Sequence, residues 1–429
     1  MRFEVERDAL AEAVAWVARA LPSRPVLPIL SGMLLHAAAG ALTLSCFDYE
    51  VSARIQLDAQ VAEPGTALVP GRLLAEITRS LPSLAVEAVQ GPDDLTLTCG
   101  EASFTLVTLP VHEYPRLPEL PRLAGTVDGG AFATAIGQVV PAASRDDTLP
   151  VLTGVNMEFE ADVITMVATD RYRLAIRELG WHPAEPDTKS TLLVPARTLA
   201  DAARMMVTGV PVRIMTRAEE AVGRARSAEA TIGFESAGRR LTTRLISTEY
   251  IKYSAQFPKE FGSRGDMPAV QLAEAVRRVA LVAERGSSVR LSFGSGKVTI
   301  EAGTEGQARA REAVRAEFSG DQTTIAFSPQ YLLDGLGAAL TAATEADPKT
   351  DQDAKQAQDT RQAQDTRQAQ DTRQAESGDQ ARISLQFTSP TKPALITGGL
   401  GGAGSMQAAE EPTPDFRYLV VPLRSLTSV

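Results

Sequence analysis

Two stretches of sequence decide the fold of this chain: LPILSGMLLHAAAGALTLSCFDYEVSA, at residues 27–53, and LPVLTGVNMEFEADVITMVATDRYRLA, at residues 149–175. They align without a gap at an offset of 122 residues, and Leu, Pro, Gly, Thr and Asp recur at the same places. The same offset aligns the helical stretch that begins at Leu10 with the one that begins at Phe132. This self-similarity indicates that the chain contains one structural unit more than once.

Further motifs extend the repeat and add a third copy. VPGRLLAEITRSL, from Val69, returns as VPARTLADAARMM, from Val194. In the last third of the chain, QLAEAVRRVALVAE resembles the first helix, SVRLSFGSGKVTIEAGTEGQARA the paired strands, and FSPQYLLDGLGAAL the second helix. The same three elements therefore occur in one order three times.

The periodicity within each copy predicts both helices and strands. Apolar residues at Leu10, Val14, Val17 and Leu21 predict an amphipathic helix, and the alternation in TLTCGEASFTLVTL predicts paired strands. One apolar stripe per helix and one apolar face per sheet favour an α+β fold. We expect three tandem copies of one unit, with helices on one side of antiparallel sheets.

Stretches rich in Pro and Gly mark the expected boundaries between the units. We expect domain 1 at residues 1–122, domain 2 at 123–260 and domain 3 at 261–429. Domain 3 is interrupted at about residues 346–380 by tandem hexapeptides, KQAQDT followed by RQAQDT. This insert has almost no apolar side chain larger than Ala. It cannot bury enough surface to offset its ordering entropy, so we expect a disordered loop.

The composition is typical of a globular protein with an acidic balance. No apolar run approaches the roughly 18 residues that a membrane span requires, and we expect no membrane partner. Cys46 and Cys99 lie in apolar, strand-like surroundings, which favours buried free thiols and a cytoplasmic location. The net charge of −10 does not exclude nucleic acid, because the potential in a groove or hole depends on local charge.

No catalytic constellation is apparent. The three histidines, His36, His112 and His182, show no metal-ligand spacing, and there is no CxxC or GxSxG motif. GSGKV suggests a phosphate-binding loop, but Leu291 stands where its first Gly should be and Val298 replaces the Ser/Thr, so a hairpin turn is favoured. GLGGAG lacks a following helix, which favours a loop. The sequence predicts a protein that is not an enzyme and that needs no metal or cofactor.

Several motifs together resemble one known family. RPVLPILSG, VATDRYRLAIREL, VPGR, VPAR, TSPTKPALITG and YLVVPLR occur in the order of the bacterial DNA polymerase III β-subunit, or sliding clamp, family, and the resemblance runs from Met1 to about Arg424. It implies a homodimer whose subunits, each of three domains, close head to tail into a ring around double-stranded DNA. A clamp loader would open the ring with ATP. Such a non-catalytic clamp tethers DNA polymerase III and other replication and repair proteins for processive synthesis.

A sliding clamp requires Lys or Arg contacts to phosphates, without side chains that read bases. The candidate residues share either one face of a repeated helix or a loop that precedes an LP(I/V)L strand. On helix faces they are Arg72, Arg79, Arg197, Arg204, Arg277 and Arg278, and on loops that reach the DNA in the family they are Arg24 and Arg145. In the third copy we expect Tyr331 and Ala338 at the positions of the repeated arginine pair, so its first helix must supply the charge.

The resemblance also implies a groove between domains 2 and 3 that binds a short peptide of the partner proteins. The matching residues come from LPVLTG, ATDRYRLA, TKPAL, the C-terminal tail and the segment YIKYSA at residues 250–255. They are Leu152, Thr169, Arg171, Tyr172, Arg173, Leu174, Ile251, Pro393, Leu419, Val420, Val421, Pro422, Leu423 and Arg424. YIKYSA departs from the usual F-P-(K/D)-(Y/F)-R of the family, since Ile251 replaces the proline.

Three interpretations are open from the sequence alone. The favoured one is the housekeeping replicative clamp. The second is a specialised second clamp whose altered pocket still serves polymerases but confers tolerance to an inhibitor of the same groove, because a clash against one ligand can leave the binding of another intact. The third, a DNA-metabolising enzyme built on a similar repeat, lacks any catalytic constellation.

Overall fold

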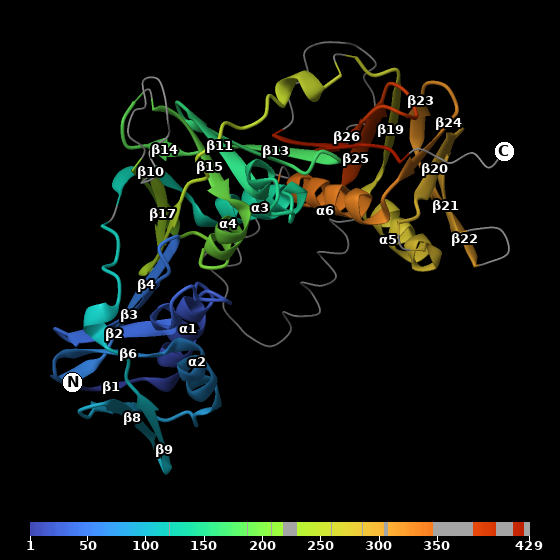
Figure 1. Ribbon diagram of the computed structural model, residues 1–429. Coiled ribbons are helices and arrows are strands. Elements are labelled where there is room, and N and C mark those ends of the chain that lie inside the picture. Colours follow the sequence, from blue (N-terminus) through green and yellow to red (C-terminus); the bar gives the residue numbers. More distant parts are fainter. Residues whose placement is uncertain are drawn as a thin grey trace, which may run out of the picture. The chain divides into compact units, whose positions relative to one another are not determined.

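The structure, a computed structural model, describes residues 1–119, 121–186, 188–206, 208–217, 230–258, 260–284, 286–303, 308–345, 381–399 and 415–423. The chain forms two compact units, whose helices and strands are labelled in Figure 1. Unit 1 comprises Met1–Ala133, Glu160–Asp162 and Gly180–Thr248, and unit 2 comprises Thr134–Phe159, Val163–Leu179 and Glu249–Val429. The hexapeptide insert and the GLGGAG motif beyond its first Gly lie outside the described residues.

Unit 1 contains two antiparallel sheets. The first has the order β5 (Gln60–Glu63), β1 (Arg2–Val5), β7 (Val86–Gln90), β8 (Asp94–Cys99) and β9 (Ala102–Val107). The second has the order β14 (His182–Pro183), β10 (Arg122–Asp128), β16 (Pro211–Arg217), β17 (Thr231–Ser236), β18 (Arg239–Arg244), β4 (Val51–Asp58), β3 (Ala41–Phe47), β2 (Gly32–Ala38) and β6 (Gly65–Pro70). The hairpin of β8 and β9 confirms the paired strands that the alternation in TLTCGEASFTLVTL predicts.

The helices of unit 1 are α1 (Arg7–Ala18), α2 (Gly71–Ser80) and α4 (Ala196–Ala203). The carboxylate of Glu6 caps α1, because it accepts hydrogen bonds from the backbone N–H groups two and three residues further on, at 3.0 and 2.6 Å. Leu10, Val14 and Val17 are buried, which confirms the predicted apolar stripe. Prolines precede α2 and α4 at the same repeat position.

Unit 2 also contains two antiparallel sheets. The larger includes, in order, β11 (Gly154–Glu160), β12 (Val163–Thr169), β13 (Arg173–Gly180), β27 (Phe416–Val420), β26 (Ala394–Gly399), β25 (Arg382–Phe387), β19 (Ser263–Pro268) and β23 (Glu317–Ser319). The smaller has the order β22 (Arg309–Arg315), β21 (Lys297–Gly303), β20 (Val289–Gly294) and β24 (Thr323–Phe327). GSGKV forms the turn between β20 and β21, with Gly296 at φ +74°, so the predicted hairpin is confirmed.

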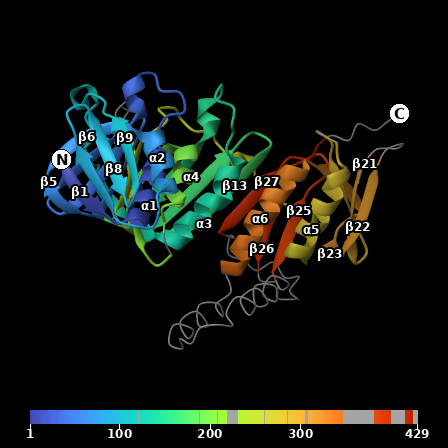
Figure 2. The ribbon, with the colours of Figure 1, turned by 90° about the horizontal axis from the view of Figure 1, so that it is seen from below.

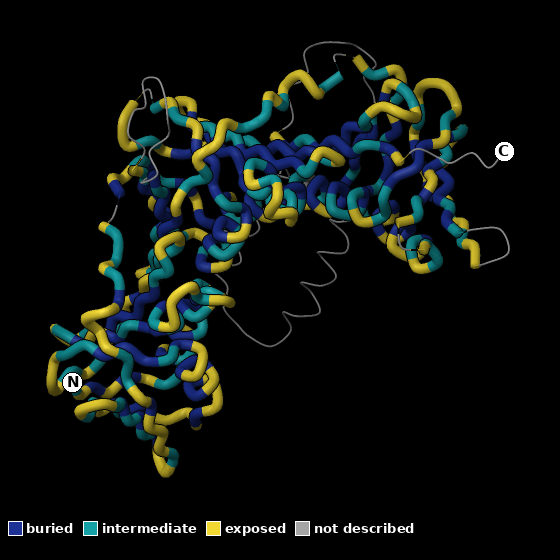
Figure 3. Tube along the Cα trace, in the orientation of Figure 1, coloured by how far each residue is buried: buried dark blue, intermediate teal, exposed yellow. Residues whose placement is uncertain are grey.

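The described residues also form α3 (Gly129–Val139), β15 (Lys189–Pro195), α5 (Ala269–Val279) and α6 (Pro329–Glu345), and six 3-10 helices lie in the same described ranges. The latter are η1 (Pro28–Ser31), η2 (Val111–Glu113), η3 (Val140–Ala142), η4 (Pro150–Thr153), η5 (Ser254–Gln256) and η6 (Ala280–Val282). In unit 2, α5 packs on β21 and β22, and α6 packs on β25, β26 and β27 (Figure 2). In unit 1, α1 packs on β3 and β4, and α2 packs on β6. The buried residues follow the strands and the helix sides that face them (Figure 3).

The internal repeat is visible in a strained turn. Tyr49 and Arg171, 122 residues apart, both have a left-handed backbone, with φ of 75° and 81°. The preceding residues, Asp48 and Asp170, each accept two backbone N–H groups on Oδ1, at 3.0 and 2.7 Å and at 3.0 and 3.1 Å. Each Asp thus stabilises a turn that places a non-glycine residue in an unfavourable conformation.

The compact units do not coincide with the three repeats. The second repeat pairs with the first where β18 runs beside β4, and with the third where β13 runs beside β27. A domain boundary usually lies where few contacts cross between neighbouring parts of the chain. A continuous sheet makes many contacts across the junction of two repeats. The three-domain division at residues 122 and 260 therefore stays a prediction.

Candidate functional site

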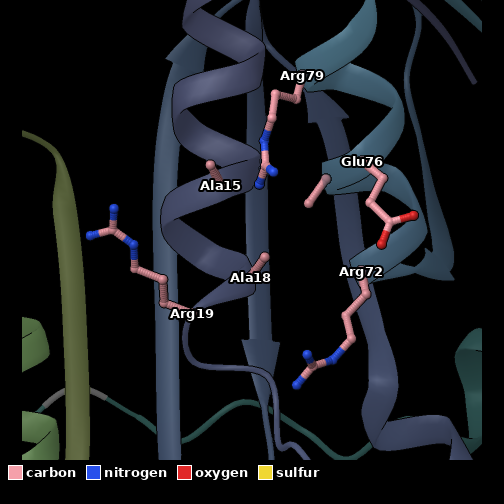
Figure 4. Close-up of a pocket in the computed structure, with 7 residues that line it drawn as sticks. Ala15, Ala18, Arg19, Arg72, Glu76 and Arg79 are labelled. Carbon is pink, nitrogen blue, oxygen red and sulfur yellow. The ribbon is translucent and has the colours of Figure 1, made fainter.

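A shallow depression of about 340 Å³ lies between α1 and α2 of unit 1 (Figure 4). Its floor is made of small side chains, and its rim has three arginines and one glutamate. The lining residues are Ala15, Ala18, Arg19, Arg72, Ala75, Glu76 and Arg79. Small residues on facing helices leave room for a bulky group to approach, and the excess of positive charge favours an anion.

The arginines of this depression have unusual freedom. Among the residues that the structure describes, Arg19, Arg72 and Arg79 form no ion pair with a carboxylate. Arg72 donates one hydrogen bond to the carbonyl oxygen of Pro22, at 3.2 Å. Exposed guanidinium groups that lack an internal partner can exchange water for phosphate oxygens without breaking an ion pair.

A second cavity in unit 1, of about 290 Å³, brings two more of the predicted arginines together. Arg24, from the loop after α1, and Arg197, from the first turn of α4, both line it, as does Arg19. The sequence placed Arg24 and Arg197 on separate motifs of two repeats. The structure shows that these motifs share one surface.

The other predicted arginines differ in their surroundings. Arg204 forms an ion pair with Asp201, at 2.5 Å. Arg278 pairs with Glu312 at 2.7 Å and with Glu274 at 3.3 Å, and the hydrogen bond with Glu312 raises the pKa of its guanidinium. These two side chains must therefore leave a carboxylate before they can bind phosphate.

In unit 2, Arg145 and Arg277 are exposed. No carboxylate pairs with either of them within the described ranges of the chain. Both side chains therefore resemble the free arginines of unit 1.

The expected third pair of helix positions is off by one residue. The three helices begin at Gly71, Ala196 and Pro329, and their fourth residues, Leu74, Leu199 and Leu332, are all buried. Gln330 and Gly337 therefore occupy the two arginine positions, and the expectation of Tyr331 and Ala338 was wrong. The physical reason is that the Pro of FSPQ begins the helix itself, whereas the Pro of VPGR and VPAR precedes it.

The predicted partner-binding residues meet in unit 2, where β13, β27 and β26 lie side by side. Arg173 pairs with Val420 across β13 and β27, and Val420 also pairs with Ala394 of β26. The backbone N–H of Val421 donates to the carbonyl oxygen of Tyr172, at 2.8 Å. The strand pairing thus joins ATDRYRLA, TKPAL and the C-terminal tail, as the resemblance implied.

An apolar cluster lies directly beneath this meeting point. It consists of Val167, Leu174, Ile176, Leu395 and Leu419, with Tyr250, Tyr253, Phe257 and Phe261 packed against it. The segment with the unusual YIKYSA sequence therefore contacts the predicted site through its aromatic side chains. Sequence reasoning missed Phe257 and Phe261, although the spacing of four aromatics over twelve residues was a readable signal.

Two polar contacts attach this aromatic segment to the sheet. The hydroxyl of Tyr253 donates to Glu158 Oε2 at 2.9 Å, and burial together with this hydrogen bond raises its pKa. The guanidinium of Arg417 lies 5.7 Å from the ring centroid of Phe257 and pairs with Glu178. The YIKYSA segment, which departs from the family pattern and forms one wall of the predicted site (the YIKYSA wall), is therefore held to the sheet by polar contacts as well as by apolar packing.

The remaining predicted residues vary in exposure. Thr169 is buried and donates through Oγ1 to the carbonyl oxygen of Arg173 at 2.6 Å, whereas Tyr172 is 52% exposed. Leu152 is buried in η4. The others have the following places: Arg171 is exposed, Ile251, Pro393 and Val421 are half-buried, Pro422 is buried and Leu423 is at the surface. Arg424 lies outside the described residues.

Within the described parts of the chain, no three His, Cys, Asp or Glu side chains are grouped so that they could hold a metal ion. The described helices include none that is long and apolar enough to span a membrane. Both cysteines are free and buried.

An apolar cluster on paired strands and a helix face with exposed arginines are typical of proteins that bind other proteins and polyanions. Family models identify the family. They match DNA polymerase III beta subunit, N-terminal domain, at residues 1–118, the central domain at 126–252 and the C-terminal domain at 255–346. The chain is 46% identical to the "Beta sliding clamp" of Streptomyces coelicolor over 99% of both chains. The chain belongs to the DNA polymerase III β-subunit family and is a DNA sliding clamp, with DNA and polymerases as its partner classes.

Other relatives add detail. The chain is 45% identical to the "Beta sliding clamp homolog GriR" of Streptomyces muensis over 78% of this chain and 88% of that protein. The fold matches the sliding clamp of Bacillus subtilis, with a TM-score of 0.78 and 22% identity over 99% of both chains. It also matches the clamp of Pseudomonas aeruginosa bound to griselimycin, with a TM-score of 0.77 and 24% identity over 99% of both chains.

Proposed function

We propose that two copies of this chain close head to tail into a ring around double-stranded DNA, and that the ring is a non-catalytic processivity factor in the cytoplasm. Contacts to DNA are made by the arginines named above and are independent of sequence. A clamp loader opens the ring with ATP. The observation that supports this most strongly is the set of exposed arginines, on helices and loops of both units, that pair with no carboxylate among the described residues.

Two sheet edges support the ring. β9 ends one sheet of unit 1 and exposes 36% of Phe104 and 71% of Val107. β22 ends the smaller sheet of unit 2, and Leu281, in η6 beside β21 of the same sheet, is 83% exposed. Exposed strand edges and large apolar side chains pair readily with another chain. Because the two edges differ, a second copy would join them in a heterologous contact, which can close into a ring.

The dimer can be tested at Leu281. Leu281→Lys places a charge in the proposed interface and should convert the dimer into monomers in sedimentation velocity. Leu123→Lys is the matched control, since Leu123 is 42% exposed and lies in β10, in a sheet that contains neither β9 nor β22. A dimer that survives Leu281→Lys, or one that Leu123→Lys dissociates equally, would contradict this assignment of the interface.

We further propose that the meeting point of β13, β27 and β26 binds the short peptide by which DNA polymerases and repair proteins attach. Its buried apolar cluster supports the strands from within, and the exposed side chains of Tyr172 and of Leu423, just after β27, are accessible to the apolar anchors of such a peptide. Primer extension on a primed circular template tests the function. Addition of the clamp and its loader should lengthen the products, and removal of residues 420–424 should abolish that gain while the ring stays on DNA. Long products without residues 420–424 would contradict the site.

A specialised second clamp is the alternative function. It is motivated by the YIKYSA wall and by the 45% identity to the GriR homolog. Ile251→Pro combined with Ala255→Arg gives back the proline of the family pattern and adds a basic residue at the end of YIKYSA, and calorimetry would compare it with the wild type for a polymerase-derived peptide and for griselimycin. A shift confined to griselimycin, of about 1–3 kcal/mol, would favour the specialised clamp. Equal affinities throughout would leave the replicative clamp alone.

A further inference from the structure

Arg173, one of the predicted peptide contacts, has its guanidinium enclosed by the protein. Only 10% of its side chain is exposed. Its Nε donates to Asp170 Oδ2 at 3.0 Å, its Nη1 pairs with Asp334 of α6, and its guanidinium lies 4.4 Å from the ring centroid of Tyr331. A guanidinium with two carboxylates and an aromatic face is already satisfied, so it does not offer a free charge to a peptide.

The groups that hold Arg173 are themselves fixed by α6 and β27. Gln330 donates from Nε2 to Asp334 Oδ1 at 2.7 Å, which orients the carboxylate. The hydroxyl of Tyr418, the residue before Leu419, donates to the carbonyl oxygen of Tyr331 at 2.9 Å. The first turns of α6 are thus connected both to Arg173 and to the tail strand of the partner site.

The repeat supplies an internal comparison. Alignment of the turns and helices places Val51, Thr198 and Asp201 of unit 1 where unit 2 has Arg173, Tyr331 and Asp334. In unit 1 these three residues line the open cavity of about 290 Å³. The repeated fold therefore does not require an arginine between these elements. The contacts of Arg173 with Asp334 and Tyr331 are specific to the helix of the third repeat and to the partner site.

We propose that Asp334 is a positioning residue of the partner site, acting through Arg173. The inference rests on the proposed peptide-binding function. The carbonyl oxygen of Arg173 accepts from Thr169, and its strand pairs with Val420, so its backbone joins the ATDRYRLA turn to the tail. Its guanidinium anchors this junction to Asp334 and Tyr331 of α6. Asp334 therefore contributes to peptide affinity without being a predicted contact of the peptide.

The test compares equivalent positions of two repeats. Asp334→Asn keeps the size of the side chain but removes its charge, and calorimetry should show about tenfold weaker binding of a polymerase-derived peptide. Asp201→Asn, at the same helix position of α4, should leave that affinity unchanged. Asp334→Glu, which keeps the charge, should restore part of the affinity. Gln330→Ala, a change at an exposed residue, should give a smaller loss in the same direction.

The outcomes separate positioning from general stability. If Asp334→Asn and Gln330→Ala both bind the peptide as the wild type does, the proposal is overturned. It is also overturned if Asp334→Glu binds as weakly as Asp334→Asn while both melt at the same lowered temperature, because the residue would then act only on the fold. Failure of the wild type to bind the peptide would instead refute the proposed site itself.

Discussion

The side chain of Tyr250 places a polar hydroxyl group in apolar surroundings beneath the predicted partner site. Its hydroxyl is buried and makes no hydrogen bond of ordinary geometry within the described structure, although the Thr169 backbone lies near it. Burial raises the pKa of the hydroxyl, which therefore stays neutral. The family pattern has a phenylalanine at this place, so the extra oxygen of this chain is an uncompensated polar atom among apolar neighbours.

We predict that Tyr250→Phe raises the free energy of unfolding by about 1 kcal/mol, because it removes a buried oxygen that has no partner. Tyr253→Phe is the matched change, because the hydroxyl of Tyr253 does have a partner. This change breaks the hydrogen bond to Glu158 and should lower the free energy of unfolding by about 1 kcal/mol. Urea denaturation of the two variants checks the pair. Two shifts of the same sign would refute this account of the aromatic wall.

Single residues were predicted with mixed success. The buried free thiols of Cys46 and Cys99 are confirmed, and burial raises the pKa of Cys46 to about 12. An apolar, alternating sequence is enough to predict such burial. The role of Arg173 could not be read in the same way, because Asp334 and Tyr331 are more than 150 residues away and only the packing of α6 joins them.

The helices differ in whether their arginines pair with carboxylates of the protein, and we expect this difference to change how much each arginine contributes to DNA binding. The depression between α1 and α2 contains Arg79 without a carboxylate partner in the described structure, whereas Arg278 on α5 pairs with two glutamates. A phosphate contact releases counterions, and an arginine that must first leave a carboxylate gains less from such a contact.

We predict that Arg79→Ala reduces the slope of log K against log salt for duplex binding by about 0.9, the value of one lost phosphate contact. Arg278→Ala should reduce the slope by less, since Glu274 and Glu312 already neutralise that guanidinium. Fluorescence anisotropy over a salt series on one duplex measures both. An equal reduction by the two variants would show that the internal ion pairs of Arg278 are irrelevant on DNA.

Helices and hairpins were the elements that the sequence could predict. The stripe of α1, the hairpin of β8 and β9 and the turn at GSGKV all have local signatures, either a period or a glycine. The pairings of β4 with β18 and of β13 with β27 have none, because residues far apart in the sequence meet there. The one-residue error at α6 arose from the different place of its proline.

For the whole molecule, the triple repeat was sufficient to predict the α+β fold and, through the resemblance, the family. The division into compact units was beyond the sequence, since sheets continue across the second repeat on both sides. The ring follows from neither observation alone. It requires two different sheet edges, at β9 and at β22, to be joined by a second copy.

A closed ring would hold the protein on DNA by topological linkage and not by affinity, so its lifetimes on circular and linear DNA must differ. The clamp is loaded by a clamp loader and ATP onto a nicked circular duplex, free protein is removed, and the bound fraction is followed after one restriction cut makes the DNA linear. We predict that the clamp persists on the circle and is lost within minutes from the linear form of the same sequence. Equal lifetimes on the two forms would contradict the ring.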